Sequence, residues 1–211
     1  VYNLCYDYSS GLLADLPLDN PTSAELYKNG FSQHTNIWGI LTGAFPEDDQ
    51  SAVMEKILSD TTLIPTTIYF RFYLFQAMQK VGMADQYTEM LGSWERMPEN
   101  GLTTFKEGDY KDRSDCHAWS ASPLYHFLSL VAGITPAEPG FRSVQIKPAL
   151  GTLEQIDASL PHPLGMIEVQ LERKGKEGIR GTIVLPEGIQ GTFIWNNNNY
   201  PLTPGSQEIK L

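Results

Sequence analysis

Acidic, basic and aromatic side chains concentrate in one segment of the sequence, GLTTFKEGDYKDRSDCHAWSASP (101–123). The segment shows neither a helical nor a strand period, which is typical of a loop. Loops held by a rigid scaffold are where catalytic residues concentrate. An aromatic side chain beside charged groups suits sugar recognition, because a ring face covers the apolar side of a pyranose while the charged groups bind its hydroxyls. Seventeen positions of the segment hold Thr103, Thr104, Glu107, Asp109, Asp112, Arg113, Asp115, His117 and Trp119.

Other interpretations of these side chains stay open. A solvated acidic loop with a buried Trp and a structural His would have the same composition, because functional and surface charges look alike in a sequence. A Ser-His-Asp triad from Ser114, His117 and Asp115 is disfavoured, because neighbouring residues rarely converge. Elsewhere, His34 is a candidate to line a site, although a lone histidine on a helix is more often structural. The sequence has no phosphate-binding glycine loop, GxSxG elbow, HExxH helix or CxxC pair, so we expect no metal and no cofactor.

The composition favours a neutral substrate. The formal net charge is −10, from 15 Lys and Arg against 25 Asp and Glu. Such a surface repels phosphate backbones and anionic membranes, which argues against nucleic-acid and membrane partners. No apolar run approaches the roughly 18–20 residues that span a bilayer. Cys5 and Cys116 lack the spacing of a zinc site, and we interpret both as buried free thiols.

Helical patterns dominate the first part of the 211 residues, which suffice for one large domain or two modest ones. The first predicted helix begins at about Ser32 and ends before Gly43, and the run TIYFRFYLFQAMQKV (67–81) is apolar almost all round, as in a helix buried inside a protein. Short loops join these helices, so a bundle or part of a helical toroid would fit. The five predicted helices cover 32–41, 46–60, 67–81, 84–97 and 123–132.

The period becomes two from Phe141 onward, which predicts short strands. The runs VQIKPAL, MIEVQLERK, IRGTIVLP, GTFIWN and QEIKL are separated by Pro, Gly and Asn turns. Strands at such regular spacing favour an antiparallel sandwich or sheet of about 70 residues. Pro136, Pro139 and Gly140 make a hinge between the two parts. We therefore predict a helical domain at 1–138 and a β-sandwich domain at 139–211.

Several of these segments together resemble the bacterial α-L-rhamnosidases of glycoside hydrolase family 78. The resemblance runs in order from about Gly11 to the end of the chain. The combination of TTxxE, a later SxCHxWS and a GIxPxxPGF boundary is specific, whereas any one of these alone would be weak. The matching pieces are SQHTNIWGIL, GLTTFKE, RSDCHAWSASP, GITPAEPGFRSVQIKPAL, PHPLGMIEVQ and LPEGIQGTFIWNNNNYPL.

The resemblance implies the C-terminal part of an (α/α)6 catalytic barrel followed by a β-sandwich, and inverting hydrolysis of terminal α-L-rhamnosides. Inverting enzymes use two carboxyl groups about 6.5–9.5 Å apart, one as acid and one as base. Glu107, the acid residue of the TTxxE motif, corresponds to the family's general base. His117 corresponds to a histidine that contacts the sugar, and Trp119 to a wall of the pocket. The family's substrates imply an extracytoplasmic location.

The sequence departs from the family in two respects. Lys106 stands where the family commonly has an aromatic residue, and a cation beside Glu107 would stabilise its carboxylate. The family's general acid lies far upstream of TTxxE, and nothing in residues 1–100 matches it. We therefore expect about half of the barrel and the general acid to be missing. An incomplete barrel would expose apolar helix faces, so we expect this chain alone to be inactive and to self-associate.

Other functions stay open. Another (α/α)6 glycosidase or a polysaccharide lyase would have the same helical pattern. The strand-rich part could instead be a non-catalytic carbohydrate-binding or structural module, with Trp195 and Tyr200 as its aromatic platform. We favour the structural version, since a lone Trp on a strand is more often part of a core. A stand-alone scaffold or interaction protein is a third interpretation.

Overall fold

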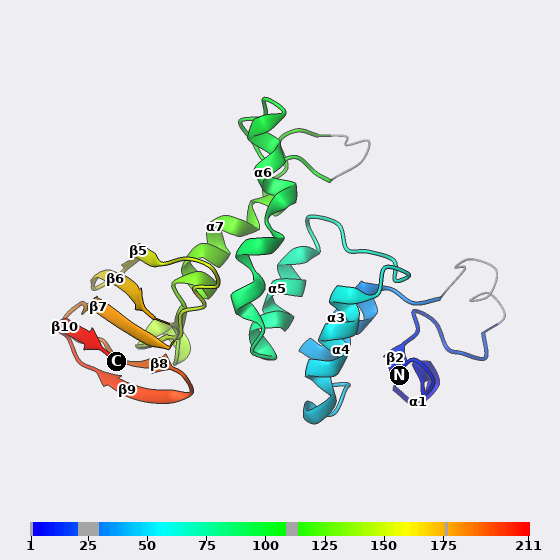
Figure 1. The fold of residues 1–211 in the computed structure, drawn as a ribbon, viewed down its shortest axis with the longest axis horizontal. Coiled ribbons are helices and arrows are strands. Elements are labelled where there is room, and N and C mark those ends of the chain that lie inside the picture. The colour runs from blue at the N-terminus through cyan, green and yellow to red at the C-terminus, as the bar shows by residue number, and fades with distance from the viewer. Residues whose placement is uncertain (1, 21–29, 109–113, 176) are drawn as a thin grey trace. The chain divides into compact units, whose positions relative to one another are not determined.

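The computed structural model describes residues 2–20, 30–108, 114–175 and 177–211. The chain divides into two compact units, and Figure 1 traces both. Unit 1 comprises residues 1–83 and 91–122, and unit 2 comprises residues 84–90 and 123–211. No described helix is long and apolar enough to cross a membrane. The domain boundary at 138/139 stays a prediction.

Unit 1 is built around the helix α3 (Gln33–Leu41), which contacts α4 (Glu47–Ser59) and α5 (Arg71–Lys80). The Ser32 side chain caps α3 by accepting a hydrogen bond from the backbone N–H of Thr35. The first turn of α4 carries three acidic residues, which the positive end of the helix dipole stabilises. These helices confirm the first two predicted ones. A helical barrel is not present among the described residues of unit 1. That these helices form part of an (α/α)6 barrel stays a prediction.

Two helix predictions in the middle of the chain were wrong in part. The apolar run at 67–81 becomes a helix only at Arg71, and its buried residues lie on one face, so the prediction of burial all round was wrong. Residues 84–97 do not form one helix. Two 3-10 turns, Ala84–Gln86 and Thr88–Met90, precede α6 (Gly92–Glu99). Gly92 lowers the α-helical preference at the point where the stretch divides. The 3-10 turns belong to unit 2, whereas α6 belongs to unit 1.

A short N-terminal segment packs onto α3. It contains α1 (Tyr2–Cys5) and a two-stranded hairpin of β1 (Tyr6–Asp7) and β2 (Leu12–Leu13). Asn36, which is fully buried in α3, binds both backbone groups of Leu13. Its side-chain oxygen accepts from the Leu13 N–H at 2.8 Å, and its amide donates to the Leu13 carbonyl at 3.1 Å.

Replacing Asn36 by Ala should therefore destabilise unit 1 by about 2–3 kcal/mol, because two buried backbone groups of Leu13 would lose their partner. Asn36→Asp is the informative second variant, since a carboxylate keeps the acceptor and loses the donor. Urea unfolding of both variants measures the effect. Equal stability of Asn36→Ala and the natural chain would contradict this role.

A helical segment connects the end of unit 1 with the strands of unit 2 along the chain. α7 (Ser122–His126) continues into a π-helical turn (Phe127–Val131), which Ala132 caps just before Gly133. Gly133 has φ +72, and a Cβ at this position would lie 2.1 Å from the backbone carbonyl of Lys147. Only glycine fits such a close approach. The predicted helix at 123–132 and its glycine stop are thus confirmed, although half of the segment is π-helical.

The rest of unit 2 is two four-stranded sheets. One has the order β10 (Gly205–Lys210), β7 (Gly178–Leu185), β6 (Gly165–Lys174), β5 (Gln155–His162), and these strands pair antiparallel. The other has the order β3 (Ile134–Pro136), β4 (Ser143–Ile146), β8 (Gln190–Trp195), β9 (Asn198–Leu202). β4 and β8 pair parallel, so the prediction of an entirely antiparallel sandwich was wrong at this pair.

Alternating apolar residues of both sheets form one core. Ile167, Val169 and Leu171 of β6 are buried, while the residues between them face outward. Phe193 of β8 and Val144 of β4 contribute from the other sheet. Two sheets that share an apolar core form a sandwich. Trp195 and Tyr200 pack against this core, which supports the structural interpretation of both residues.

Candidate functional site

A continuous group of rings lies on unit 1 and contains three of the four predicted site residues. The group, called the aromatic band below, starts on α3 and α5. The ring centroids of His34 and Phe70 are 4.3 Å apart, and those of Trp38 and Tyr73 are 4.8 Å apart. Phe70 and Tyr73 are 5.1 Å apart between centroids. His34 and Trp38 are one helical turn apart, which places both side chains on one face of α3.

The band continues to the loop that follows α6. The ring centroid of Tyr69 lies 6.3 Å from that of Tyr73 and 4.6 Å from that of Trp119. The centroids of Trp119 and His117 are 4.1 Å apart. The seven rings of the band therefore connect the segment around His34 with the segment around His117. The members are His34, Trp38, Tyr69, Phe70, Tyr73, His117 and Trp119.

The band is accessible at both ends. Trp38 is 43% exposed and Trp119 is 45% exposed, while the rings between them are half-buried. A hydrogen bond with Tyr69 raises the pKa of the Tyr73 hydroxyl, which keeps this phenol neutral. Exposed indole faces next to neutral hydroxyls can bind the apolar face and the hydroxyls of a sugar ring.

Glu107 is held on the loop by backbone hydrogen bonds. Its N–H donates to the carbonyl of Ser114 at 2.9 Å, and the N–H of His117 donates to the carbonyl of Phe105 at 2.6 Å. These two bonds hold residues 105–107 alongside residues 114–117. Glu107 and His117 therefore lie on adjacent segments, and the Glu107 side chain is half-buried.

The loop is anchored to α6 through a buried tryptophan. The indole N–H of Trp94 donates to the carbonyl of Ser120 at 2.7 Å, and Ser120 is fully buried. Trp94 also contacts Phe75 of α5. The guanidinium carbon of Arg71 lies over the Trp94 ring, 5.8 Å from its centroid. Through Trp94, the backbone around Trp119 is thus linked to α5, which carries Tyr73 and begins two residues after Tyr69.

The electrostatic environment of His34 favours its neutral form. Burial lowers the pKa of the imidazole, and the nearby carboxylate of Asp15 opposes this effect in part. Asp15 itself accepts a hydrogen bond from the Ser32 hydroxyl at 2.6 Å. A neutral imidazole can donate or accept a hydrogen bond to a sugar hydroxyl.

His34 should therefore titrate below its ordinary value of 6.5. Because the folded state disfavours the imidazolium, the stability that His34 contributes is fully present above pH 6.5 and is lost as the pH falls through the folded-state pKa. NMR titration of the imidazole measures this pKa, and His34→Gln identifies the signal. Asp15→Asn should lower the pKa further. A pKa at or above 6.5 would contradict the buried environment.

The structure brings several sequence-predicted residues together. His34, His117 and Trp119 are members of the aromatic band, and Glu107 lies on the segment beside His117. The Oγ of Ser114 donates to the Cys116 carbonyl at 2.9 Å, which does not support a triad with His117. Asp109, Asp112 and Arg113 lie outside the described residues.

The two thiols differ in their environment. Cys5 is free and buried, as expected, whereas Cys116 is free and exposed. The prediction of a buried Cys116 was wrong, because this residue lies on the exposed part of the loop between two polar neighbours.

Sequence reasoning missed four members of the band, Trp38, Tyr69, Phe70 and Tyr73. Three of them lie in the apolar run at 67–81, in which α5 begins only at Arg71, so Tyr69 and Phe70 precede the helix and Tyr73 lies on it. Helical spacing was therefore not a usable signal for this aromatic face. No group of three or more metal-ligating side chains occurs among the residues that the structure describes.

Comparison with solved structures shows that the fold of this chain also occurs as part of several rhamnosidases. The chain aligns with a family 78 rhamnosidase of Bacillus sp. GL1 at a TM-score of 0.74 and 19% identity, covering 92% of this chain and 21% of that one. An α-L-rhamnosidase from Aspergillus terreus aligns at a TM-score of 0.71 and 18% identity, covering 85% of this chain and 24% of that one. A Streptomyces avermitilis α-L-rhamnosidase in complex with L-rhamnose aligns at a TM-score of 0.72 and 16% identity, covering 85% of this chain and 21% of that one. The chain thus spans less than a quarter of each enzyme.

A family model matches the strand-rich part of the chain. Residues 133–210 match the model of the bacterial alpha-L-rhamnosidase C-terminal domain. Together with the shared fold, this match confirms the resemblance of the chain to the C-terminal part of a family 78 α-L-rhamnosidase. The Aspergillus structure shows that the fold also occurs outside bacteria. A search of curated proteins gave no significant match.

Proposed function

We propose that this chain is the C-terminal part of an enzyme that hydrolyses terminal α-L-rhamnosides with inversion. The match of residues 133–210 to the rhamnosidase C-terminal domain carries the proposal. The aromatic band supports it, since exposed Trp119 and Trp38 provide ring faces that can cover the apolar side of a sugar ring. An extracytoplasmic location and membership of α3–α6 in an (α/α)6 barrel belong to the same proposal.

Glu107 is the general base in this proposal. Its carboxylate removes a proton from the water that attacks the anomeric carbon, while a general acid protonates the leaving oxygen. The acid comes from a part of the enzyme outside these 211 residues. His117 and His34 bind sugar hydroxyls, and Trp119 forms one wall of the pocket. Terminal rhamnose is the substrate because the similar structures are rhamnosidases.

Hydrolysis of an aryl α-L-rhamnoside by the full-length enzyme tests the proposal, with aryl glycosides of other sugars as comparison. ¹H NMR of the first product identifies its anomer. Inversion gives the β-anomer first, which then equilibrates in solution. First formation of the α-anomer would overturn the inverting mechanism, and turnover of another glycoside alone would overturn the substrate.

Self-association of the 211-residue chain is a further expectation. Unit 2 exposes Leu124, Tyr125 and Phe127 by 65%, 51% and 45%, and the exposed apolar side chains of adjacent residues favour association. Light scattering after gel filtration should show oligomers whose proportion rises with concentration. Leu124→Lys should reduce that proportion. A monomer at every concentration would contradict the expectation.

A further inference from the structure

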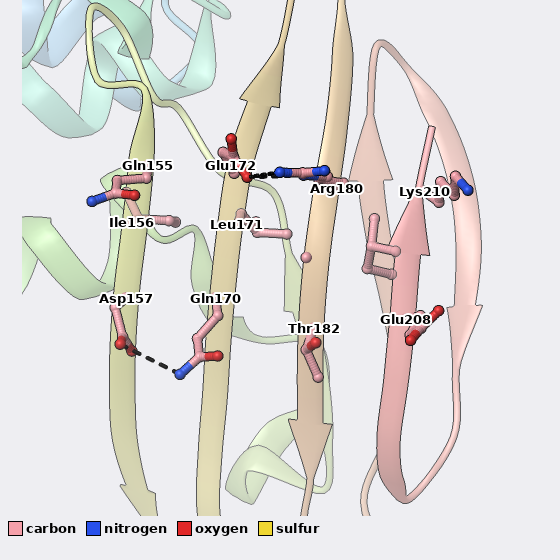
Figure 2. Close-up of a pocket in the computed structure, with 12 residues that line it drawn as sticks. Gln155, Ile156, Asp157, Gln170, Leu171, Glu172, Arg180, Thr182, Glu208 and Lys210 are labelled. Carbon is pink, nitrogen blue, oxygen red and sulfur yellow. Dashed lines mark hydrogen bonds and ion pairs between the residues drawn. The ribbon is translucent and has the colours of Figure 1, made fainter.

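The outward face of the sheet β10–β7–β6–β5 forms a polar groove in unit 2, with a volume of about 660 Å³ (Figure 2). Two rows of side chains border it, each with one residue from every strand. Cross-strand pairing places both rows in register. The first row is Gln155, Glu172, Arg180 and Lys210, and the second row is Asp157, Gln170, Thr182 and Glu208.

Backbone forms the floor between the rows. The four residues of the floor are Ile156, Leu171, Gly181 and Ile209, of which Leu171 and Ile209 have side chains buried in the core. Gly181 has φ +155, and a Cβ there would lie 1.9 Å from the Gln170 carbonyl oxygen, so only glycine fits. Alternate residues of a strand are about 6.8 Å apart, and four strands span about 14 Å. The two rows therefore run across the strands, one on each side of the floor.

The polar side chains of the groove hold one another in place. Glu172 pairs with Arg180 at 2.7 Å across the first row, and Lys174 donates to its other oxygen at 2.5 Å. These hydrogen bonds, the one from Lys174 first, lower the pKa of Glu172, so its carboxylate is charged. In the second row, the Gln170 amide donates to Asp157 at 3.4 Å, as Figure 2 shows.

The chemistry of the lining excludes several ligand classes. Three carboxylates stand against two cations, and one cation is paired with Glu172, so no cluster of cations exists for a phosphate or a polyanion. No lining residue is aromatic, which argues against a planar aromatic ligand. Two amides, a hydroxyl and near-balanced charges instead offer hydrogen-bond donors and acceptors in both rows.

We propose that this groove binds a short, linear, neutral oligosaccharide across the strands. The saccharide then lies across the strands on the outer ends of the two rows, and its hydroxyls bond to side chains of both rows. Charge balance favours a neutral ligand, and two rows in register favour a linear one. The inference does not depend on rhamnoside hydrolysis, because the groove lies within unit 2 and none of its residues belongs to the aromatic band.

Chemical-shift perturbation in the ¹⁵N-labelled 211-residue chain tests the proposal. The neutral probes are cellotriose, xylotriose and mannotriose, and the anionic comparison is trigalacturonate. At least one neutral trisaccharide should bind with a Kd of about 0.1–5 mM, and the shifts should cluster in residues 155–157, 170–172, 180–182 and 208–210.

Two groove variants and a matched control separate binding here from binding elsewhere. Gln170→Ala and Arg180→Ala should each weaken the bound trisaccharide about fivefold, the effect of losing one hydrogen bond. Gln190→Ala removes an exposed glutamine from the other sheet and should leave the Kd unchanged. The amide spectra of all three variants establish that the sandwich is folded.

Each contrary outcome has a clear meaning. Absence of shifts with all three neutral probes up to about 20 mM would overturn the proposal. Shifts confined to unit 1, binding of trigalacturonate alone, or equal Kd values for Gln170→Ala and Gln190→Ala would also overturn it.

Discussion

Replacing Glu107 by Gln should lower the rate of rhamnoside hydrolysis by the full-length enzyme by about 10²–10⁴-fold. Gln keeps the shape of the side chain but cannot accept the proton of the attacking water. The backbone bonds of Glu107 with Ser114 and of His117 with Phe105 do not involve the changed atoms, so the loop should keep its conformation. Steady-state hydrolysis of an aryl α-L-rhamnoside measures the loss, which should appear in kcat.

Asp115→Asn is the matched control for this prediction. Asp115 is an exposed acidic residue of the same loop, so its replacement removes one charge from the loop without removing the proposed base. We expect its rate to stay within about threefold of the natural enzyme, as for surface substitutions in general. An active Glu107→Gln together with an inactive Asp115→Asn would indicate that Asp115, and not Glu107, is the general base.

The location of the candidate site was predictable from sequence because its side chains are unusual for a loop. Glu107, His117 and Trp119 stand out by type and proximity within one segment. Trp38 and Tyr73 do not, since aromatic residues in an apolar run are normally core. Which of these rings face outward depends on where α5 begins. The helix begins at Arg71 and not at residue 67. That start depends on tertiary packing, which local periodicity does not encode.

The sandwich shows the same limit. Alternation in β6 and β7 gave both strands from sequence, and the pair Asn196 and Asn197 has the positive φ of a tight hairpin. β5 was missed although Ile156, Ala158 and Leu160 alternate, because the run is short of strongly apolar residues. The parallel pairing of β4 with β8 was also missed. It joins residues more than forty positions apart, and no local pattern specifies such a register.

Replacing Phe193 by Ala should destabilise the sandwich by about 3–5 kcal/mol. Phe193 is fully buried in β8, where it is paired with Ile146 of β4 and Tyr200 of β9. Its loss would remove a large apolar side chain from the core that joins both sheets and leave a cavity. Such a loss is a large fraction of the roughly 5–15 kcal/mol that stabilises a native protein.

Amide hydrogen exchange is the suitable measurement, because two units need not unfold together and a single transition would mix them. The free energy of opening should fall in β4, β8 and β9 for Phe193→Ala. Leu164→Ala is the control, since Leu164 is 59% exposed on the turn between β5 and β6 and should cost less than about 0.5 kcal/mol. A loss below about 1 kcal/mol for Phe193→Ala would mean that Phe193 does not join the two sheets. A loss of protection in unit 1 as well would mean that its helices depend on the sandwich for their stability.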